Sequence, residues 1–277
     1  MISVLVLTLN EAQDLPGCLE SVPWCDDLHV FDSFSTDETV ALAKRHGASV
    51  IQRPFDDYAS QRNAALQRCA FRHPWVLVLD ADERATDGLR QALVRFLGSA
   101  DAAGHAAARL RRRDYFEGTW LRHVQASPFY VRLLRPTRCR YSRAINEVVE
   151  VDGPIFDLDA HIEHYPFSKG IAHWVDKHNR YSSMEALEVL DNWSRQAAFS
   201  WRRMFSRDFN ERRRHQKALF YRLPARPLIK FLVLYLFKGG FLDGRAGLTY
   251  ARLQAMYEYL IVLKTREHLD RRRNGKA

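Results

Sequence analysis

The sequence lacks any apolar run long enough to cross a membrane. Its longest uninterrupted run, residues 231–237, lies between Lys230 and Lys238, whereas a spanning helix needs about 20 apolar residues. The N-terminus, MISVLVLTLNE, also lacks the basic segment and the small-residue cleavage site of a signal peptide. These absences predict a cytoplasmic chain that crosses no bilayer.

Cysteine, proline and glycine are also scarce. The four cysteines, at positions 18, 25, 69 and 139, include no Cys-x-x-Cys pair, so we expect buried free thiols and no disulfide framework. Ten prolines and 13 glycines among 277 residues exclude collagen-like and low-complexity architectures. The length instead favours one α/β domain with an appended region.

Acidic residues are few near the C-terminus. Residues 201–277 hold 19 Lys and Arg against 6 Asp and Glu, whereas residues 1–200 hold 23 against 27. The basic part also contains the apolar stretch LIKFLVLYLFKGGFL, and this combination favours an anionic membrane surface as a partner. Nucleic acid is a rival partner, and a helical tail with merely solvated charges is a third reading.

The apolar stretch has helical spacing. Over residues 227–242 an i, i+3, i+4 pattern would align an apolar stripe consisting of Leu228, Phe231, Leu232, Tyr235 and Leu242. Lys230, Lys238 and the arginines at 212–214 would then surround the stripe with positive charge.

Strand and helix patterns alternate over the first hundred residues. Apolar runs predict strands at residues 2–9, 28–31, 48–52 and 75–79, with helical segments near 15–22, 39–46 and 58–69 between them. Such alternation predicts a Rossmann-like, mostly parallel sheet. Further strands at 106–115, 129–135 and 148–151 lack intervening helices, which predicts an antiparallel extension.

The region beyond residue 169 reads as almost entirely helical. One helix begins at Arg226–Pro227, and the pair Gly239–Gly240 ends or breaks it. We therefore predict an α/β region at 1–168 and a helical, basic region suited to membrane association at 169–277.

Polar residues follow three of the predicted strands. They are Thr8, Asn10 and Glu11 after the first, Asp32 after the second, and Asp80, Asp82 and Glu83 after the fourth. Open α/β sheets bind ligands beyond the carboxyl ends of their strands. Asp80 and Asp82 are two residues apart, so in extended backbone they point the same way. Carboxylates beside phosphate oxygens suit Mg²⁺ or Mn²⁺.

These motifs together resemble family 2 glycosyltransferases of the GT-A fold. The resemblance rests on TLNE, DSFSTDET, DYASQRNAAL and VLVLDADER, and continues through NEVVEVDGP, HIEHYPFSKGIAHWVDKHNRYS and RPLIKFLVLYLFKGGFLDGRAG. The extended set is similar to bacterial transferases that build lipopolysaccharide core, including β-1,4-glucosyltransferases. The resemblance implies an inverting transfer of a hexose, glucose favoured, from a nucleotide-sugar that is UDP-linked, with a divalent metal holding the diphosphate.

The resemblance also implies roles for individual residues. Those that border the nucleotide are Thr8, Asn10, Glu11, Asp32, Gln61, Arg62, Asn63 and Asp80, of which Asp32 reads the base or ribose and Asp80 lies on the ribose side. Asp82 is the implied metal ligand. His164 fits a further ligand that some GT-A enzymes place beyond the catalytic loop, although an ordinary buried histidine is the alternative.

Inversion requires a base that takes the proton of the acceptor hydroxyl. Related enzymes carry His-Glu at the start of a strand after the Asp-x-Asp loop, and this chain has Asn146–Glu147 there. Glu147 is therefore the candidate base, with Glu83 as the competitor. The asparagine removes any role that needs an imidazole.

The acceptor remains open at the level of sequence. A lipopolysaccharide core or a related surface glycan is expected, with polyprenyl phosphate or protein as alternatives within the same fold. A basic nucleic-acid-binding protein is disfavoured because no known nucleic-acid motif is present, and because Asp32, Asp80, Asp82 and Glu83 would repel phosphates without a metal.

Overall fold

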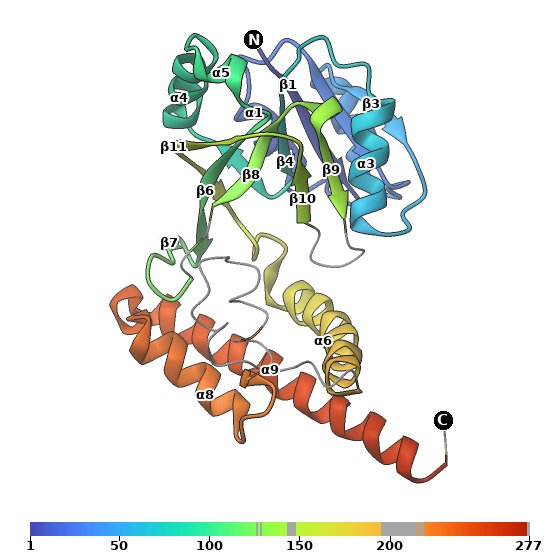
Figure 1. Cartoon of the computed structure of the whole chain (residues 1–277), viewed down its shortest axis with the longest axis vertical. Coiled ribbons are helices and arrows are strands. Elements are labelled where there is room, and N and C mark those ends of the chain that lie inside the picture. Colours follow the sequence, from blue (N-terminus) through green and yellow to red (C-terminus); the bar gives the residue numbers. More distant parts are fainter. Residues whose placement is uncertain (126, 128, 143–147, 195–214, 216–218, 276–277) are drawn as a thin grey trace. The chain divides into compact units, whose positions relative to one another are not determined.

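The computed structural model describes residues 1–277 except 126, 128, 143–147, 195–214, 216–218 and 276–277. The chain forms two compact units (Figure 1). The sheet unit comprises Met1–Tyr115 and Ser127–Ser168, and the helical unit comprises Phe116–Ala126 and Lys169–Ala277. Residues 116–126, which the sequence division placed in the first region, thus belong to the helical unit.

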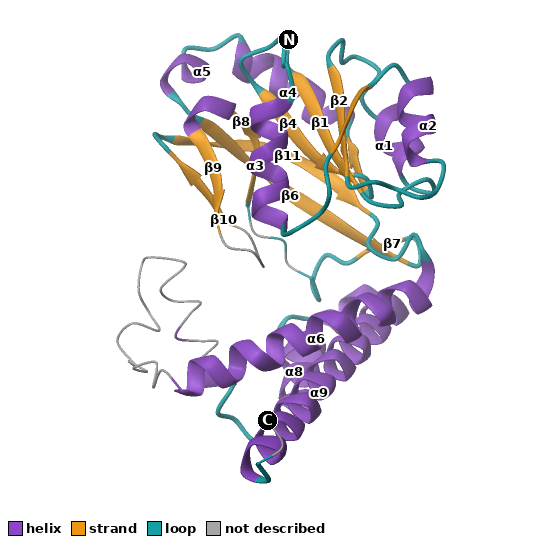
Figure 2. Cartoon of the chain, turned by 90° about the vertical axis from the view of Figure 1, so that its right-hand side faces the viewer, coloured by secondary structure: helices purple, strands orange, loops and turns teal. Residues whose placement is uncertain are grey.

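One large sheet organises the sheet unit (Figure 2). Its strands lie in the order β3 (Ser49–Gln52), β2 (Leu28–Asp32), β1 (Ser3–Thr8), β4 (Val76–Asp80), β8 (Tyr130–Leu134), β6 (Ala107–Phe116), β11 (Ile155–His164) and β5 (Glu83–Ala85). The first four are parallel, β8 is antiparallel to both neighbours, and β11 runs parallel to β6 and antiparallel to β5. The predicted α/β fold with an antiparallel extension is confirmed.

Both faces of the central strands are buried, which explains their continuous apolar runs. Along β1, Val4 and Val6 join one core cluster and Leu5 joins the other. Helices α1 (Leu15–Glu20) and α4 (Asp87–Leu97) contribute to the first cluster, and α3 (Tyr58–Arg68) contributes to the second. The helix α2 (Thr39–Arg45) adds Ala43 to the first. Because helices pack on both faces of the sheet, the positions of the strand ends are fixed.

Several elements differ from the sequence expectation. The strand β10 (Val148–Val151) was expected to extend the sheet, but it forms a separate two-stranded sheet with β9 (Cys139–Ser142). The strand β11 was not predicted, although its alternating buried residues Leu158, Ala160 and Ile162 carry the period of two. Shorter elements are β7 (Thr119–Trp120), α5 (Asp101–Gly104) and the 3₁₀ turn η1 (Pro136–Arg138).

The helical unit contains α6 (Gly170–Ser194), α8 (Arg226–Leu232), the π-helical turn η3 (Val233–Phe237), the 3₁₀ turn η4 (Gly240–Asp243) and α9 (Gly244–Arg273). Among the residues described in this unit, Val189 of α6, Tyr221 and Ile261 of α9 pack together in a buried cluster. A buried ion pair joins Arg226 to Glu258. None of the helices in the described ranges is long and apolar enough to cross a membrane.

The helix that begins at Arg226 ends before Gly239, as the glycine pair predicted. Gly239 has a φ of 74°, a conformation that favours glycine. The single helix over 227–242 that the apolar stripe presupposed is therefore not formed.

Candidate active site

The first two strand ends are joined by a buried carboxylate. Thr8 and Asp32 are paired in register, and the Thr8 hydroxyl donates to Asp32 at 2.8 Å. Asp32 is fully buried and also accepts from the Ser35 amide at 2.9 Å, the Ser35 hydroxyl and the Gln52 amide at 2.9 Å. Its oxygens therefore shape the loop after β2, and a nucleotide that contacted Asp32 would have to displace one of these donors.

The loop after β1 is bonded to the loop after β2. Asn10 has a φ of 56°, which asparagine tolerates better than most residues. Its side-chain oxygen accepts from the Thr36 amide at 2.8 Å, and its own amide donates to the Ser35 hydroxyl at 2.8 Å. The Glu11 amide donates to the Thr39 hydroxyl at 2.8 Å. Residues that were expected to border the nucleotide thus lie at one edge of the sheet.

Helix α3 brings two of its three predicted residues to this edge. Gln61 is buried and donates to the Ser33 hydroxyl at 2.9 Å, and Arg62 donates to Asp80 at 2.9 Å. Asn63 instead pairs with the backbone of Tyr141, with both hydrogen bonds at 2.8 Å. Asn63 therefore fastens α3 to β9.

Asp80 ends β4 between two guanidinium groups. Arg62 contacts one of its carboxylate oxygens and Arg132 the other, both at 2.9 Å. Burial opposes ionisation, but the charges of Arg132 and Arg62 outweigh it and hold the pKa of Asp80 well below its usual range. Asp80 is therefore ionised at neutral pH.

Glu83 lies beneath Asp80 and is fully buried. One of its oxygens accepts from the Asp80 amide at 2.9 Å, and the other accepts from Arg132 at 2.5 Å. Burial raises the pKa of Glu83 even though Arg132 favours the charged form. The side chain thus fixes the backbone of the Asp80–Asp82 loop and has no solvent-exposed surface.

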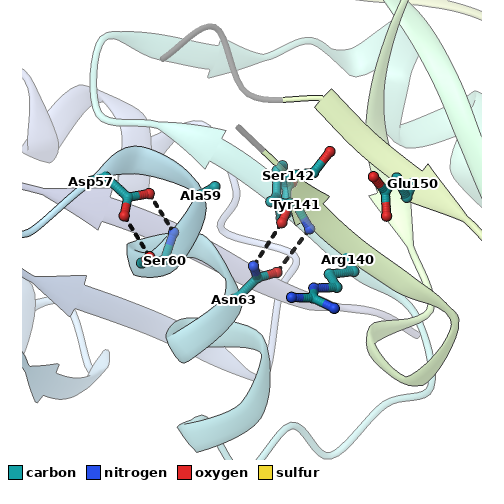
Figure 3. A pocket seen from close by; sticks show the side chains of 8 residues that line it. All are labelled: Asp57, Ala59, Ser60, Asn63, Arg140, Tyr141, Ser142 and Glu150. Atoms are coloured by element: carbon teal, nitrogen blue, oxygen red, sulfur yellow. Dashed lines mark hydrogen bonds between the residues drawn. The ribbon is translucent and has the colours of Figure 1, made fainter. Parts of the chain in front are cut away.

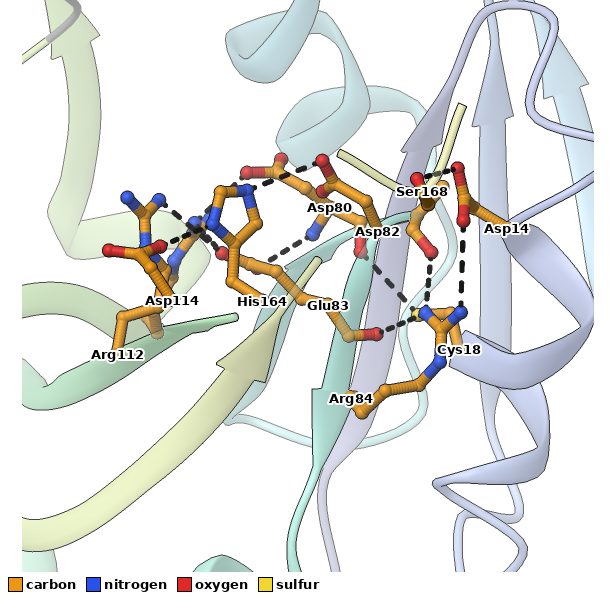
Figure 4. Close-up of polar contacts among 12 residues, drawn as sticks. Asp14, Cys18, Asp80, Asp82, Glu83, Arg84, Arg112, Asp114, His164 and Ser168 are labelled. Carbon is orange, nitrogen blue, oxygen red and sulfur yellow. Dashed lines mark hydrogen bonds and ion pairs between the residues drawn. The ribbon is translucent and has the colours of Figure 1, made fainter. Parts of the chain in front are cut away.

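Asp82 and His164 face one another across the site (Figure 4). The distance from His164 Nε2 to Asp82 Oδ2 is 3.3 Å, and Asp114 accepts a short hydrogen bond from His164 Nδ1. Burial lowers the pKa of His164, but the charges and hydrogen bonds of Asp82 and Asp114 raise it to about 9. The three side chains form a line in which Asp114 orients the imidazole toward Asp82.

This chemistry fits a divalent metal. A carboxylate oxygen and an imidazole nitrogen converge, and a second carboxylate fixes the far side of the imidazole, as is usual for metal-bound histidine. A bound ion would displace the proton from Nε2 of His164. Among the described residues no group of three or more His, Cys, Asp and Glu side chains surrounds one metal position. Oxygen atoms of a bound phosphate and of water would complete the coordination shell, as is usual for Mg²⁺ and similar ions.

A shallow cleft of about 430 Å³ lies between α3 and the β9–β10 hairpin (Figure 3). Its lining is largely polar and comprises Asp57, Ala59, Ser60, Asn63, Arg140, Tyr141, Ser142 and Glu150. Glu147, the candidate base, and Asn146 lie between β9 and β10 and outside the described residues. The structure therefore places the flanks of that segment beside an open polar cleft.

A comparison with known protein families identifies the family to which the sheet unit belongs. The family model described as "Glycosyl transferase family 2" matches residues 3–152. The chain belongs to this family. The resemblance seen in the sequence is therefore confirmed, together with the GT-A class of fold that it implied.

The similarity to other glycosyltransferases continues beyond residues 3–152. The lipopolysaccharide core biosynthesis glycosyltransferase LpsC of Rhizobium meliloti is 27% identical over 97% of this chain and 96% of its own length. An uncharacterized glycosyltransferase of Rickettsia felis is 28% identical and covers 68% of this chain and 70% of its own. The enzyme is thus a homologue of a lipopolysaccharide core glycosyltransferase along nearly its whole length.

Solved structures give a more distant likeness. Glucosyl-3-phosphoglycerate synthase from Mycobacterium tuberculosis, crystallised with Mn²⁺, uridine diphosphate and glucosyl-3-phosphoglycerate, is 24% identical with a TM-score of 0.35. The match covers 41% of the glycosyltransferase and 44% of the synthase. A further mycobacterial protein is 16% identical with a TM-score of 0.40, and the match covers 60% of this chain and 65% of that one.

Three charged residues of the glycosyltransferase site were missed by the sequence analysis: Arg112, Asp114 and Arg132. Arg112 and Asp114 are two residues apart on β6, and their side chains form an ion pair of 2.9 Å. Arg132 interrupts the apolar strand YVRLL of β8 and is 7% exposed. A charged residue within a buried strand was the available signal, because such residues are seldom buried without a partner.

His164 contacts Asp114 on one side and Asp82 on the other, and this arrangement predicts that Asp114 supports metal binding. We expect Asp114→Asn to weaken Mn²⁺ binding about 10–100-fold, because the amide no longer fixes the tautomer and orientation of His164. Calorimetric titration of the donor-free enzyme with Mn²⁺ measures this directly. Asp157→Asn is the matched control, since Asp157 belongs to the same sheet but pairs with Arg109 at the surface. Equal Mn²⁺ affinity in wild type and Asp114→Asn would contradict the assignment.

Proposed function

We propose that this glycosyltransferase moves a hexose, with glucose favoured, from a UDP-sugar to a lipopolysaccharide core or related surface-glycan acceptor, with inversion at the anomeric carbon. The observation that carries the proposal is the Asp82–His164 pair beside the ionised Asp80 at the strand ends of a family 2 sheet. The near full-length similarity to LpsC supports this class of acceptor.

The donor half of the site follows from the polar edge of the sheet. The residues proposed to border the nucleotide-sugar are Thr8, Asn10, Glu11, Asp32, Gln61, Arg62 and Asp80. Asp82 and His164 are proposed to hold Mg²⁺ or Mn²⁺, and the bound ion would offset the charge that grows on the departing diphosphate. Arg132 and Glu83 hold the loop that presents Asp82.

Glu147 is the proposed base. Its competitor, Glu83, is enclosed and hydrogen-bonded through both oxygens, so an acceptor hydroxyl does not reach it. We expect Glu147→Gln to lower turnover about 10²–10⁴-fold while donor affinity stays unchanged. Initial rates and a donor-binding titration on the same preparation separate these quantities. Normal turnover with glutamine at 147 would rule out this residue as the base.

Donor binding tests the proposal first. Thermal unfolding with Mn²⁺ and a panel of nucleotide-sugars should show the largest rise in melting temperature with UDP-glucose. A ligand at 100 times its dissociation constant stabilises the native state by about 2.7 kcal/mol. Turnover with lipid A–core, polyprenyl phosphate and peptide acceptors then decides the acceptor class. Stabilisation by no UDP-sugar would overturn the proposal.

We also propose that the enzyme works at the inner face of the cytoplasmic membrane. A lipid-linked acceptor presents its sugar at a bilayer surface. The excess of basic residues beyond position 200 supports attraction to anionic lipid. The arginines at 212–214, which were expected to take part, lie outside the described residues.

A further inference from the structure

A group of large apolar side chains is exposed near the end of α8. We call it the apolar tip and define it by Leu228, Val233, Leu236, Phe237, Phe241 and Leu242. Phe237 is 84% exposed and Leu242 62% exposed. Single exposed apolar residues are common, but several within fifteen consecutive positions mark an interaction surface. The tip lies wholly in the helical unit, in the orange part of the chain in Figure 1.

The π-helical turn η3 determines which residues form the tip. Val233–Phe237 winds more loosely than an α-helix, so each side chain after Val233 points in a different direction from that of a regular helix. Leu234 is consequently buried at 4% exposure, while Leu236 and Phe237 are exposed. Phe231 and Tyr235 of the predicted stripe are only partly exposed and stack on each other, with ring centroids 5.4 Å apart.

The chain reversal within the tip, between Phe237 and Phe241, is tightly built. A Cβ on Gly240 would lie 2.7 Å from the Leu234 carbonyl, and one on Gly247 would lie 2.0 Å from the Gly240 carbonyl. Asp243 is buried and accepts from the amides of His123 and Val124 at 3.0 and 2.8 Å. The exposed side chains therefore project from an anchored turn.

Positive charge accompanies the tip. Residues 226–242 contain Arg226, Lys230 and Lys238 and no Asp or Glu. Arg226 is neutralised by the buried Glu258, so Lys230 and Lys238 supply the remaining formal charge of this segment. Lys238 is exposed, and the nearby charge of Lys230 is among the causes that lower its pKa. An anion placed beside the two ammonium groups would relieve their repulsion.

We propose that the apolar tip inserts into the interface of an anionic phospholipid bilayer, with Lys230 and Lys238 at the level of the lipid phosphates. Aromatic and aliphatic side chains beside lysines are the features that bind such interfaces. A second copy of the chain fits less well, because a two-fold contact through this surface would bring the lysines of both copies together. The inference rests on the proposed action at a membrane and names the residues that contact the lipid.

Vesicle sedimentation of the full chain tests the proposal. We expect binding to phosphatidylcholine vesicles that contain phosphatidylglycerol, and weaker binding as salt is raised. Leu236→Ser/Phe237→Ser should lower the partition coefficient at least about tenfold, given the apolar area removed. Lys230→Gln/Lys238→Gln should lower it about tenfold on anionic vesicles and leave binding to pure phosphatidylcholine unchanged. Leu187→Ser is the control, because Leu187 is 51% exposed but lies on α6.

Three outcomes would overturn the tip as a lipid surface: equal binding to both kinds of vesicle, no binding to either, or unchanged binding by Leu236→Ser/Phe237→Ser. A dimer in solution that this variant dissociates would assign the surface to a second copy instead. Donor binding in thermal unfolding separates this inference from the proposed reaction. Vesicle binding without nucleotide-sugar binding would defeat the reaction alone, and the reverse would defeat the tip alone.

Discussion

Asp82→Asn is expected to remove most transferase activity while leaving the fold intact. The carboxylate is partly exposed and faces His164 at 3.3 Å, and the imidazole keeps Asp114 as a partner after the change, so no buried charge is left unpaired. A neutral amide oxygen binds a divalent cation weakly, and stabilisation of the departing diphosphate is lost with the ion. We expect turnover to fall at least about 10²–10³-fold, as for other losses of charge stabilisation in a transition state.

Two measurements check this result. Initial rates at saturating Mn²⁺ give the loss of turnover, and calorimetric titration gives the loss of Mn²⁺ affinity. Asp87→Asn is the matched control, because Asp87 is an exposed carboxylate in the first turn of α4 and should affect neither quantity. Near wild-type turnover of Asp82→Asn in metal-replete buffer would show that Asp82 is not a metal ligand.

The central sheet was predictable because its strands are buried on both faces. Such strands are continuous apolar runs, and the polar residues that end them mark the edge at which a parallel sheet binds ligands. Asp80 and Asp82 were identified for this reason. The same argument fails for the outer strands, since β11 alternates in polarity and pairs with β6 and β5 far away in sequence.

Asp114 and Arg132 illustrate what sequence reasoning could not supply. Asp114 meets His164 only because β6 and β11 are parallel and in register at these two residues. Arg132 meets Glu83 because β8 lies beside β4. Nothing local to either residue encodes these partners, so their roles depend on strand order.

The C-terminal apolar stretch shows a different limit of prediction from sequence. Its composition predicted an exposed surface, but its spacing was analysed with an α-helical period. The π-helical turn at Val233–Phe237 changes that period, so Leu236 and Phe237 are exposed, whereas Tyr235 of the expected stripe is only partly exposed. A single π-helical turn has no clear signature in one sequence.

Arg132→Met is expected to destabilise the enzyme strongly, by about 3–5 kcal/mol. Arg132 is 7% exposed and contacts Asp80 at 2.9 Å and Glu83 at 2.5 Å. Methionine fills similar space but leaves the buried Glu83 carboxylate without this partner, and the Arg112 guanidinium lies 3.9 Å away. Asp80 keeps Arg62. Arg109→Met is the control, because that exposed pair with Asp157 should contribute no more than about 1 kcal/mol.

The pH dependence identifies the group responsible. Burial already raises the pKa of Glu83, and loss of Arg132 raises it further. A carboxyl whose folded pKa lies above its unfolded pKa stabilises the fold at low pH and loses that contribution as pH rises through the folded value. The deficit in the free energy of unfolding should therefore be largest near about pH 7 and shrink toward about pH 5.

Urea unfolding at both pH values measures this deficit, and Arg132→Met/Glu83→Gln should recover most of the loss at neutral pH. A deficit that is independent of pH, or that Glu83→Gln leaves unchanged, would show that Glu83 is not the group that Arg132 stabilises.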